Sequence, residues 1–129
     1  MHLHAALITA LTVLVLILAV YLVGRARGKY GIAAPAITGQ PDFERAFRAH
    51  QNTVEQVVMF LPALWLAAMY GNEQLAVYLG YAWIVGRVLY LFGYIRAAGN
   101  RSAGFMINAL AMIGLLIIGM QGIIKAMMG

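Results

Sequence analysis

Long apolar stretches, separated by short polar segments, make up most of the chain. A helix needs roughly 20 mostly apolar residues to cross a lipid bilayer, and four stretches of about that length cover residues 3–23, 47–70, 75–95 and 103–124. The first contains no Asp, Glu, Lys or Arg, whereas the second opens with several polar residues before it becomes apolar. The pattern predicts an all-α integral membrane protein, a bundle of four transmembrane helices that forms a single domain over residues 1–129.

The composition excludes an ordinary soluble domain. Hydrophobic residues make up 64% and charged residues 10% of the chain, against about 45–50% and about 25% in typical soluble domains. The net charge of +5 does not indicate a nucleic-acid partner, because several cations lie inside or beside apolar stretches and not on one solvated face. No metal site is expected. The chain has no Cys, and its His and carboxylate residues do not have the spacing that is typical of catalytic zinc. Sulfur chemistry would have to use the thiol of a substrate.

The cations of the connecting segments predict the orientation in the membrane. The first and third connections together carry six of them, Arg25, Arg27, Lys29, Arg45, Arg96 and Arg101. The opposite side has Lys125 alone. Because cytoplasmic loops are enriched in Lys and Arg, both basic connections are expected in the cytoplasm and both termini outside.

A cleavable signal peptide is the alternative reading of residues 3–23. No Lys or Arg precedes this stretch, it is longer than a signal-peptide core, and no small-residue cleavage site follows it. The short loops and the lack of a targeting extension favour a bacterial inner membrane, although an internal eukaryotic membrane fits the same charge rule.

Polar residues inside the apolar stretches form two stripes. The first stripe, at spacing i, i+4, i+7 in the second predicted helix, is Arg48, Asn52 and Glu55. The second, at i, i+3, i+7 in the third, is Arg87, Tyr90 and Tyr94, and it points on toward Arg101. Residues at these spacings share one helix face, so each stripe is expected to face a partner helix or a ligand.

The charges of these stripes do not balance. Glu55 is the only acidic residue well inside a predicted span, and it cannot neutralise Arg48, Arg87 and Arg101 together. Ionisable residues at membrane depth are costly and usually functional, so the residues predict a positive cavity that opens to the cytoplasm and binds an anion. The alternative is structural: Arg48, Glu55 and Arg87 pair to fix the helix register, and the tyrosines fill space.

Two segments resemble a known family. The first, at residues 37–55, contains Phe-Glu-Arg at 43–45, Arg-Ala at 48–49, Asn52 and Glu55. The second is Gly-Arg-Val-Leu-Tyr-Leu-Phe-Gly-Tyr-Ile-Arg at 86–96, followed by Arg101. They resemble the MAPEG superfamily, the membrane-associated proteins in eicosanoid and glutathione metabolism, and are most similar to the branch of leukotriene C4 synthase, five-lipoxygenase-activating protein and microsomal glutathione transferase 2.

The resemblance implies a homotrimer that binds glutathione, as co-substrate, between neighbouring subunits near the cytoplasmic side. Positions that match glutathione contacts of the family are Arg27, Arg48, Asn52, Glu55, Tyr90 and Tyr94, and Arg101 matches the arginine that activates the thiol. The chain departs from the family pattern with His50 in place of Gln, Gln56 in place of Tyr and Gly28 inserted in the basic cluster after Arg27.

The expected function is that of a membrane-bound glutathione transferase. Its thiolate would attack lipophilic small molecules that enter from the membrane lipids, and the same thiolate could reduce hydroperoxides. A non-catalytic lipid-binding or adaptor protein of the same fold is the alternative, and a purely structural membrane protein without any ligand is another.

Overall fold

The computed structural model describes the backbone of residues 1–129 and every side chain except that of Ala98. The chain is helical almost throughout, with elements α1 (Leu3–Tyr30), α2 (Pro41–Tyr70), α3 (Glu73–Arg96), the short 3₁₀ helix η1 (Ala98–Arg101) and α4 (Ser102–Met128). In the described part of the chain, four helices are long and apolar enough to cross a membrane. The predicted all-helical membrane fold is therefore confirmed.

The helices extend beyond the predicted spans at the basic connections. α1 continues through its cationic cluster to Tyr30 and ends at Gly31, whose φ of 66° is the left-handed conformation that favours glycine. α2 begins at Pro41, not at residue 47, and the Gln40 side chain accepts a hydrogen bond from the backbone N–H of Phe43 at 2.9 Å. Hydropathy marks only the part of a helix that lies in lipid, whereas its hydrogen bonding continues into the polar boundary.

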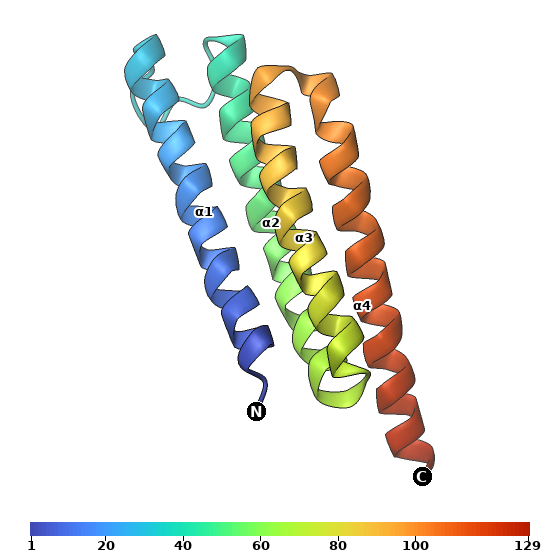
Figure 1. The fold of residues 1–129 in the computed structure, drawn as a ribbon. Coiled ribbons are helices and arrows are strands. Elements are labelled where there is room, and N and C mark those ends of the chain that lie inside the picture. The colour runs from blue at the N-terminus through green and yellow to red at the C-terminus, as the bar shows by residue number, and fades with distance from the viewer.

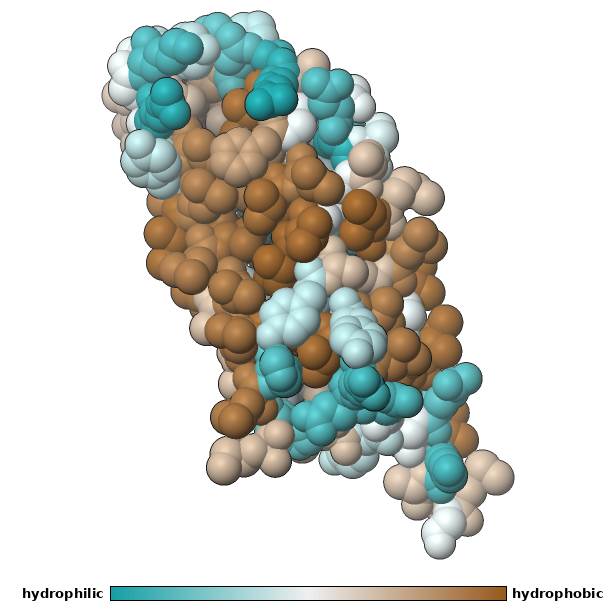
Figure 2. Space-filling model, viewed as in Figure 1, coloured by the Kyte–Doolittle hydropathy of each residue, from teal (hydrophilic) through white to brown (hydrophobic). Residues whose placement is uncertain are grey.

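Both basic connections lie at one end of the bundle. The α1–α2 connection and the α3–η1–α4 connection meet there, and we call this the basic end. The two termini and the α2–α3 turn lie at the opposite end (Figure 1). Between the ends, hydrophobic residues cover much of the face shown in Figure 2. The structure thus places the six cations predicted for the connections on one side of an apolar band, with Lys125 on the other, which is the arrangement that the charge rule describes.

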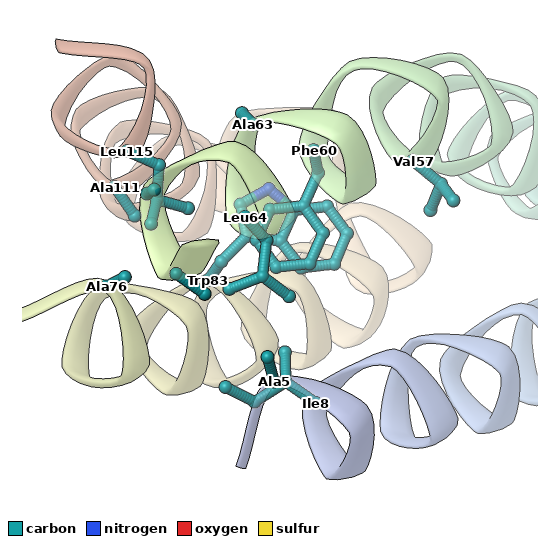
Figure 3. Close-up of a cluster of buried hydrophobic side chains, with 12 residues drawn as sticks. Ala5, Ile8, Val57, Phe60, Ala63, Leu64, Ala76, Trp83, Ala111 and Leu115 are labelled. Carbon is teal, nitrogen blue, oxygen red and sulfur yellow. The ribbon is translucent and has the colours of Figure 1, made fainter. Parts of the chain in front are cut away.

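The middle of the bundle is the antiparallel pair α2 and α3. α1 packs against this pair on one side, and α4 packs against it on the other. The largest apolar core lies toward the opposite end, where the rings of Phe60 and Trp83 stack at 3.9 Å between centroids (Figure 3). Ile8, Leu64 and Leu115 are fully buried around them. This leaves the α2–α3–α4 side of the basic end for polar residues.

α3 and α4 approach each other very closely near the basic end. A Cβ atom added to Gly104 would lie 2.5 Å from the Gly86 carbonyl oxygen and 2.5 Å from the Tyr90 backbone nitrogen. Only glycine fits at such a distance, because the obstructing atoms belong to the backbone of the neighbouring helix. The contact fixes the start of α4, and with it Arg101, against the α3 segment that carries Tyr90.

Candidate active site

A cavity of about 360 Å³ lies between α2, α3 and the start of α4 in the basic half of the bundle. Its lining consists of Arg48, Gln51, Asn52, Glu55, Tyr90, Tyr94, Arg101 and Phe105. Except for the buried Arg87, the residues of both predicted polar stripes therefore face the same space. Six of the seven predicted site residues lie together here, and Arg27 is the exception.

α2 supplies one wall of the cavity through its helical spacing. Ala49 and Thr53 lie on the buried face of α2, and the Thr53 hydroxyl donates a hydrogen bond to the Ala49 carbonyl at 2.7 Å. Arg48 and Glu55 point the other way and are exposed in the single chain, while Asn52, at the edge between the two faces, is half-buried. Packing of the apolar face thus directs the polar stripe into the cavity.

Cations and aromatic rings alternate along α3 and η1, where Tyr90, Tyr94 and Arg101 line the cavity and Arg87 lies buried behind them. The Arg87 guanidinium lies over the Tyr90 ring at 4.1 Å, and the Arg101 guanidinium lies over the Tyr94 ring at 5.0 Å. The two tyrosine rings meet edge to face at 5.6 Å between centroids. Each cation is attracted to the electron-rich face of its ring, so the four side chains hold one another in a row from the bundle interior to the basic end.

Arg87 is fully buried and is held by neutral oxygens. Its Nε donates to Asn108 Oδ1 at 3.0 Å, and its Nη1 donates to Asn52 Oδ1 at 2.9 Å and to Thr53 Oγ1 at 3.3 Å. Its Nη2 makes no hydrogen bond to the described residues. Asn108 is fixed in turn, because its amide nitrogen donates to the Trp83 carbonyl at 2.7 Å.

This arrangement is not the carboxylate pairing considered from the sequence. Neither of the two ion pairs among the described side chains includes Arg48, Glu55 or Arg87, so the structure of one chain contradicts the alternative in which these three residues pair to fix the register. Amide and hydroxyl oxygens from α2 and α4 replace the carboxylate. The buried charge of Arg87 is consequently not neutralised by a neighbouring acid.

Asn52 connects this buried network to the cavity. Its amide oxygen accepts from Arg87, while the same side chain lines the cavity. The amide nitrogen, which is a donor only, is therefore the group that remains for a ligand. Together with Arg48 and Arg101 against the single carboxylate of Glu55, it makes the cavity a place for an anion.

Arg27 lies outside this cavity, in the last turn of α1, beside the α1–α2 connection. Its Nη1 donates to the carbonyl oxygens of Ala36 at 2.7 Å and Ile32 at 3.4 Å, and its guanidinium lies over the Phe43 ring at 4.8 Å. Within one chain it shapes the connection and does not join the other predicted residues.

Two residues of the lining were not among the predicted site residues. Gln51 lies three residues after Arg48, so the helical spacing could have identified it. Phe105 follows the α3–α4 connection, and no spacing rule on α2 or α3 indicates it. No group of three His, Asp or Glu side chains that could hold a metal ion occurs among the described residues.

Comparisons with known proteins agree on one family. A sequence model of the MAPEG family matches residues 5–120. The chain is 47% identical over 112 residues to an uncharacterized protein of Synechocystis sp., covering 87% of this chain and 82% of that protein. It is 46% identical over 101 residues to human microsomal glutathione S-transferase 2, covering 78% of this chain and 69% of that protein. It is also 35% identical over 124 residues to leukotriene C4 synthase of Cavia porcellus, covering 94% of this chain and 83% of that protein.

Proposed function

The chain belongs to the MAPEG family, and on this basis we propose that it is a membrane-bound glutathione transferase with glutathione as its co-substrate. The observation that carries the proposal is the cavity between α2, α3 and α4, which gathers two arginines, a glutamate, two amides and two tyrosines. The names of two relatives, a glutathione S-transferase and leukotriene C4 synthase, support it.

The charges of the cavity suit those of glutathione. The tripeptide carries two carboxylates, one ammonium group and one thiol. Arg48 binds a carboxylate through a charge-assisted pair of hydrogen bonds, and Glu55 binds the ammonium group. Asn52 donates from its amide nitrogen, and Tyr90 and Tyr94 supply hydroxyl groups from the other wall.

Arg101 stabilises the reactive form of the thiol. A free thiol has a pKa of about 8.5, so only a few per cent is thiolate at neutral pH. Lowering that pKa by about two units requires about 2.7 kcal/mol of preferential thiolate stabilisation. One guanidinium near the sulfur in a partly dry site is sufficient for this. The proton leaves to water at the basic end.

The thiolate then reacts with a lipophilic molecule. With an electrophilic carbon, sulfur forms the new bond and the electron pair of the broken bond goes to the leaving group. With a hydroperoxide, sulfur attacks the terminal oxygen and the O–O bond breaks, which gives a sulfenic acid of glutathione and an alkoxide that takes a proton from water to become the alcohol. A second glutathione converts the sulfenic acid to the disulfide and water.

A homotrimer would complete the site. Arg48, Glu55 and Arg101 are exposed in the single chain although they border the apolar band, and charged groups facing lipid are costly. A neighbouring subunit covers them and contributes its own Arg27, which explains why this residue lies outside the cavity of its own chain. The positive-inside rule supports a cytoplasmic basic end with both termini outside, and the membrane that we propose is a bacterial inner membrane.

Titration of the detergent-solubilised protein with glutathione at neutral pH tests the proposal. We expect a saturable thiolate band in the ultraviolet difference spectrum. Arg101→Ala should remove this band while calorimetry still detects glutathione binding, because the arginine acts on the sulfur. Arg96→Ala is the matched control, since this arginine lies at the same end but does not line the cavity.

Two results would contradict the proposal. Binding without any thiolate band in the unmodified protein would favour a non-catalytic adaptor of the same fold. The absence of glutathione binding would mean that the cavity serves a different anion.

A further inference from the structure

A second cavity, of about 350 Å³, lies at the basic end on the side of α1. It is formed by the end of α1, the start of α2 and the end of α3. No residue of its lining also lines the candidate active site. The two cavities therefore lie on different sides of the bundle, and the proposed glutathione chemistry does not use this one.

Three cations line this second cavity. Arg25 and Lys29 are four residues apart, so they lie on one face of α1, and Arg96 comes from the last residue of α3. All three side chains are exposed. Neither ion pair among the described side chains involves any of them.

The one carboxylate in the lining is already engaged. Asp42 forms an ion pair with Arg45 and accepts a hydrogen bond from the Tyr30 hydroxyl at 3.1 Å. Even if its charge is counted in full, three cations against one carboxylate leave the cavity with two excess positive charges. An anion of charge −2 would neutralise this excess, and an anion of charge −1 would halve it.

The remaining walls are apolar and lead toward the membrane interior. Leu22, Ala46 and Ile95 line the cavity beside the cations. Leu18, one turn before Leu22 in α1, is a half-buried apolar side chain packed against the cluster that contains Ala19 and Leu91 between α1 and α3. The ligand that fits therefore has an anionic head at the boundary between lipid and water and an apolar tail that extends into the bilayer.

We propose that this cavity binds the phosphate-bearing headgroup of an anionic phospholipid, with its acyl chains against the α1–α3 contact. Basic pockets between transmembrane helices on the cytoplasmic side suit such headgroups, because anionic lipids give that leaflet its negative surface potential. A soluble phosphate offers the same charge but nothing for the apolar walls. Cations that merely anchor a helix at the interface would show neither saturation nor a preference for one headgroup.

Native mass spectrometry of the detergent-solubilised full chain tests the proposal. Phosphatidylglycerol and phosphatidylcholine are titrated separately, since the second has the same phosphate but no net charge. We expect one phosphatidylglycerol per chain, bound at least tenfold more tightly than phosphatidylcholine. Each cation near a membrane surface contributes roughly a fivefold change in affinity, so Arg25→Gln combined with Arg96→Gln should weaken phosphatidylglycerol binding about thirtyfold.

Two lysine variants, one inside the cavity and one far from it, provide the matched control. Lys29→Gln should weaken phosphatidylglycerol binding about fivefold, whereas Lys125→Gln, near the end of α4, should leave it unchanged. Glutathione binding should be unaffected in every one of these variants, because none of the residues lines the candidate active site. That readout also shows that each variant remains folded.

Three outcomes would overturn the proposal. Equal binding of the two lipids would mean that charge does not select the ligand. Equal losses in Lys29→Gln and Lys125→Gln would mean that general surface charge, and not this cavity, attracts the lipid. Displacement of phosphatidylglycerol by millimolar inorganic phosphate would assign the cavity to small soluble anions.

Discussion

Replacing Asn52 with Asp tests the arrangement around Arg87 and gives opposite effects on stability and binding. In the wild type, Arg87 Nη1 lies 2.9 Å from the Asn52 side-chain oxygen. The aspartate has the same size and keeps an oxygen that accepts this hydrogen bond. The substitution exchanges the amide nitrogen for a second carboxylate oxygen. Arg87 acquires a negatively charged partner, and the cavity loses a donor.

The magnitudes follow from the distance and the burial. Two unit charges 2.9 Å apart attract each other by about 6 kcal/mol at an effective dielectric constant of about 20. Most of this is offset by dehydration of the new carboxylate, which costs several kcal/mol when buried and less for Asn52, which is half-buried. A net stabilisation of about 1–2 kcal/mol is expected, because the wild-type Arg87 is a buried charge without an acid.

Glutathione affinity should change in the other direction. Losing the donor and adding a like charge beside the ligand's carboxylates should cost about 2–3 kcal/mol, which is about a 30- to 150-fold loss of affinity. Thermal unfolding followed by tryptophan fluorescence measures the stability, and calorimetry measures the affinity.

Asn52→Ala serves as the control for this experiment. It removes the acceptor and the donor together, so stability and affinity should both fall. If Asn52→Asp loses as much stability as Asn52→Ala, then a carboxylate beside Arg87 does not stabilise the fold, and the argument from its buried charge is refuted. If Asn52→Asp keeps full glutathione affinity, then Asn52 does not donate to the ligand.

Two further predictions concern the site and the helix contact that holds it. Arg48→Ala and Glu55→Ala should each weaken glutathione binding at least tenfold, while glutathione that still binds at saturating concentration shows the full thiolate band. An equal loss of thiolate per bound ligand in these variants and in Arg101→Ala would contradict the separate roles. Gly104→Ala should cost about 1–3 kcal/mol and lower glutathione affinity, because its Cβ would lie 2.5 Å from the Tyr90 backbone nitrogen. Gly24→Ala, in α1 with nothing within 4 Å of the added Cβ, should stabilise the protein by about 0.5–1 kcal/mol, and a loss there as large as at Gly104 would refute the close-approach argument.

Hydropathy and helical spacing were sufficient for the helical fold and for six of the eight residues that line the candidate cavity. The apolar stretches identified the four helices, and the i, i+4, i+7 stripe on α2 placed Arg48, Asn52 and Glu55 on one wall. The helix ends were not predictable in the same way. A helix continues wherever a cap permits, so Gly31 and Gln40, and not the boundary of the lipid, set where α1 ends and α2 begins.

The partners of Arg87 were beyond a reading of the sequence. A count of acids indicated Glu55, but Asn52, Thr53 and Asn108 supply the oxygens. Helical spacing describes one face of one helix, whereas these contacts depend on how α2 and α4 are rotated against α3. The same limit applies to Phe105, which enters the cavity only through the close approach of α4.

The Phe60–Trp83 stack lies toward the end of the bundle that carries the termini, and the polar cavity lies toward the basic end. Each long helix therefore has an apolar half and a half that borders polar residues. In α2, the residues that line the cavity lie in the first half, up to Glu55, and Phe60 and Leu64 are fully buried in the apolar core beyond them. One continuous helix thus lines the candidate site with its first half and packs the apolar core with its second. Substitutions that retune the ligand need not disturb the packing, so a short membrane chain can diversify its chemistry without rebuilding its scaffold.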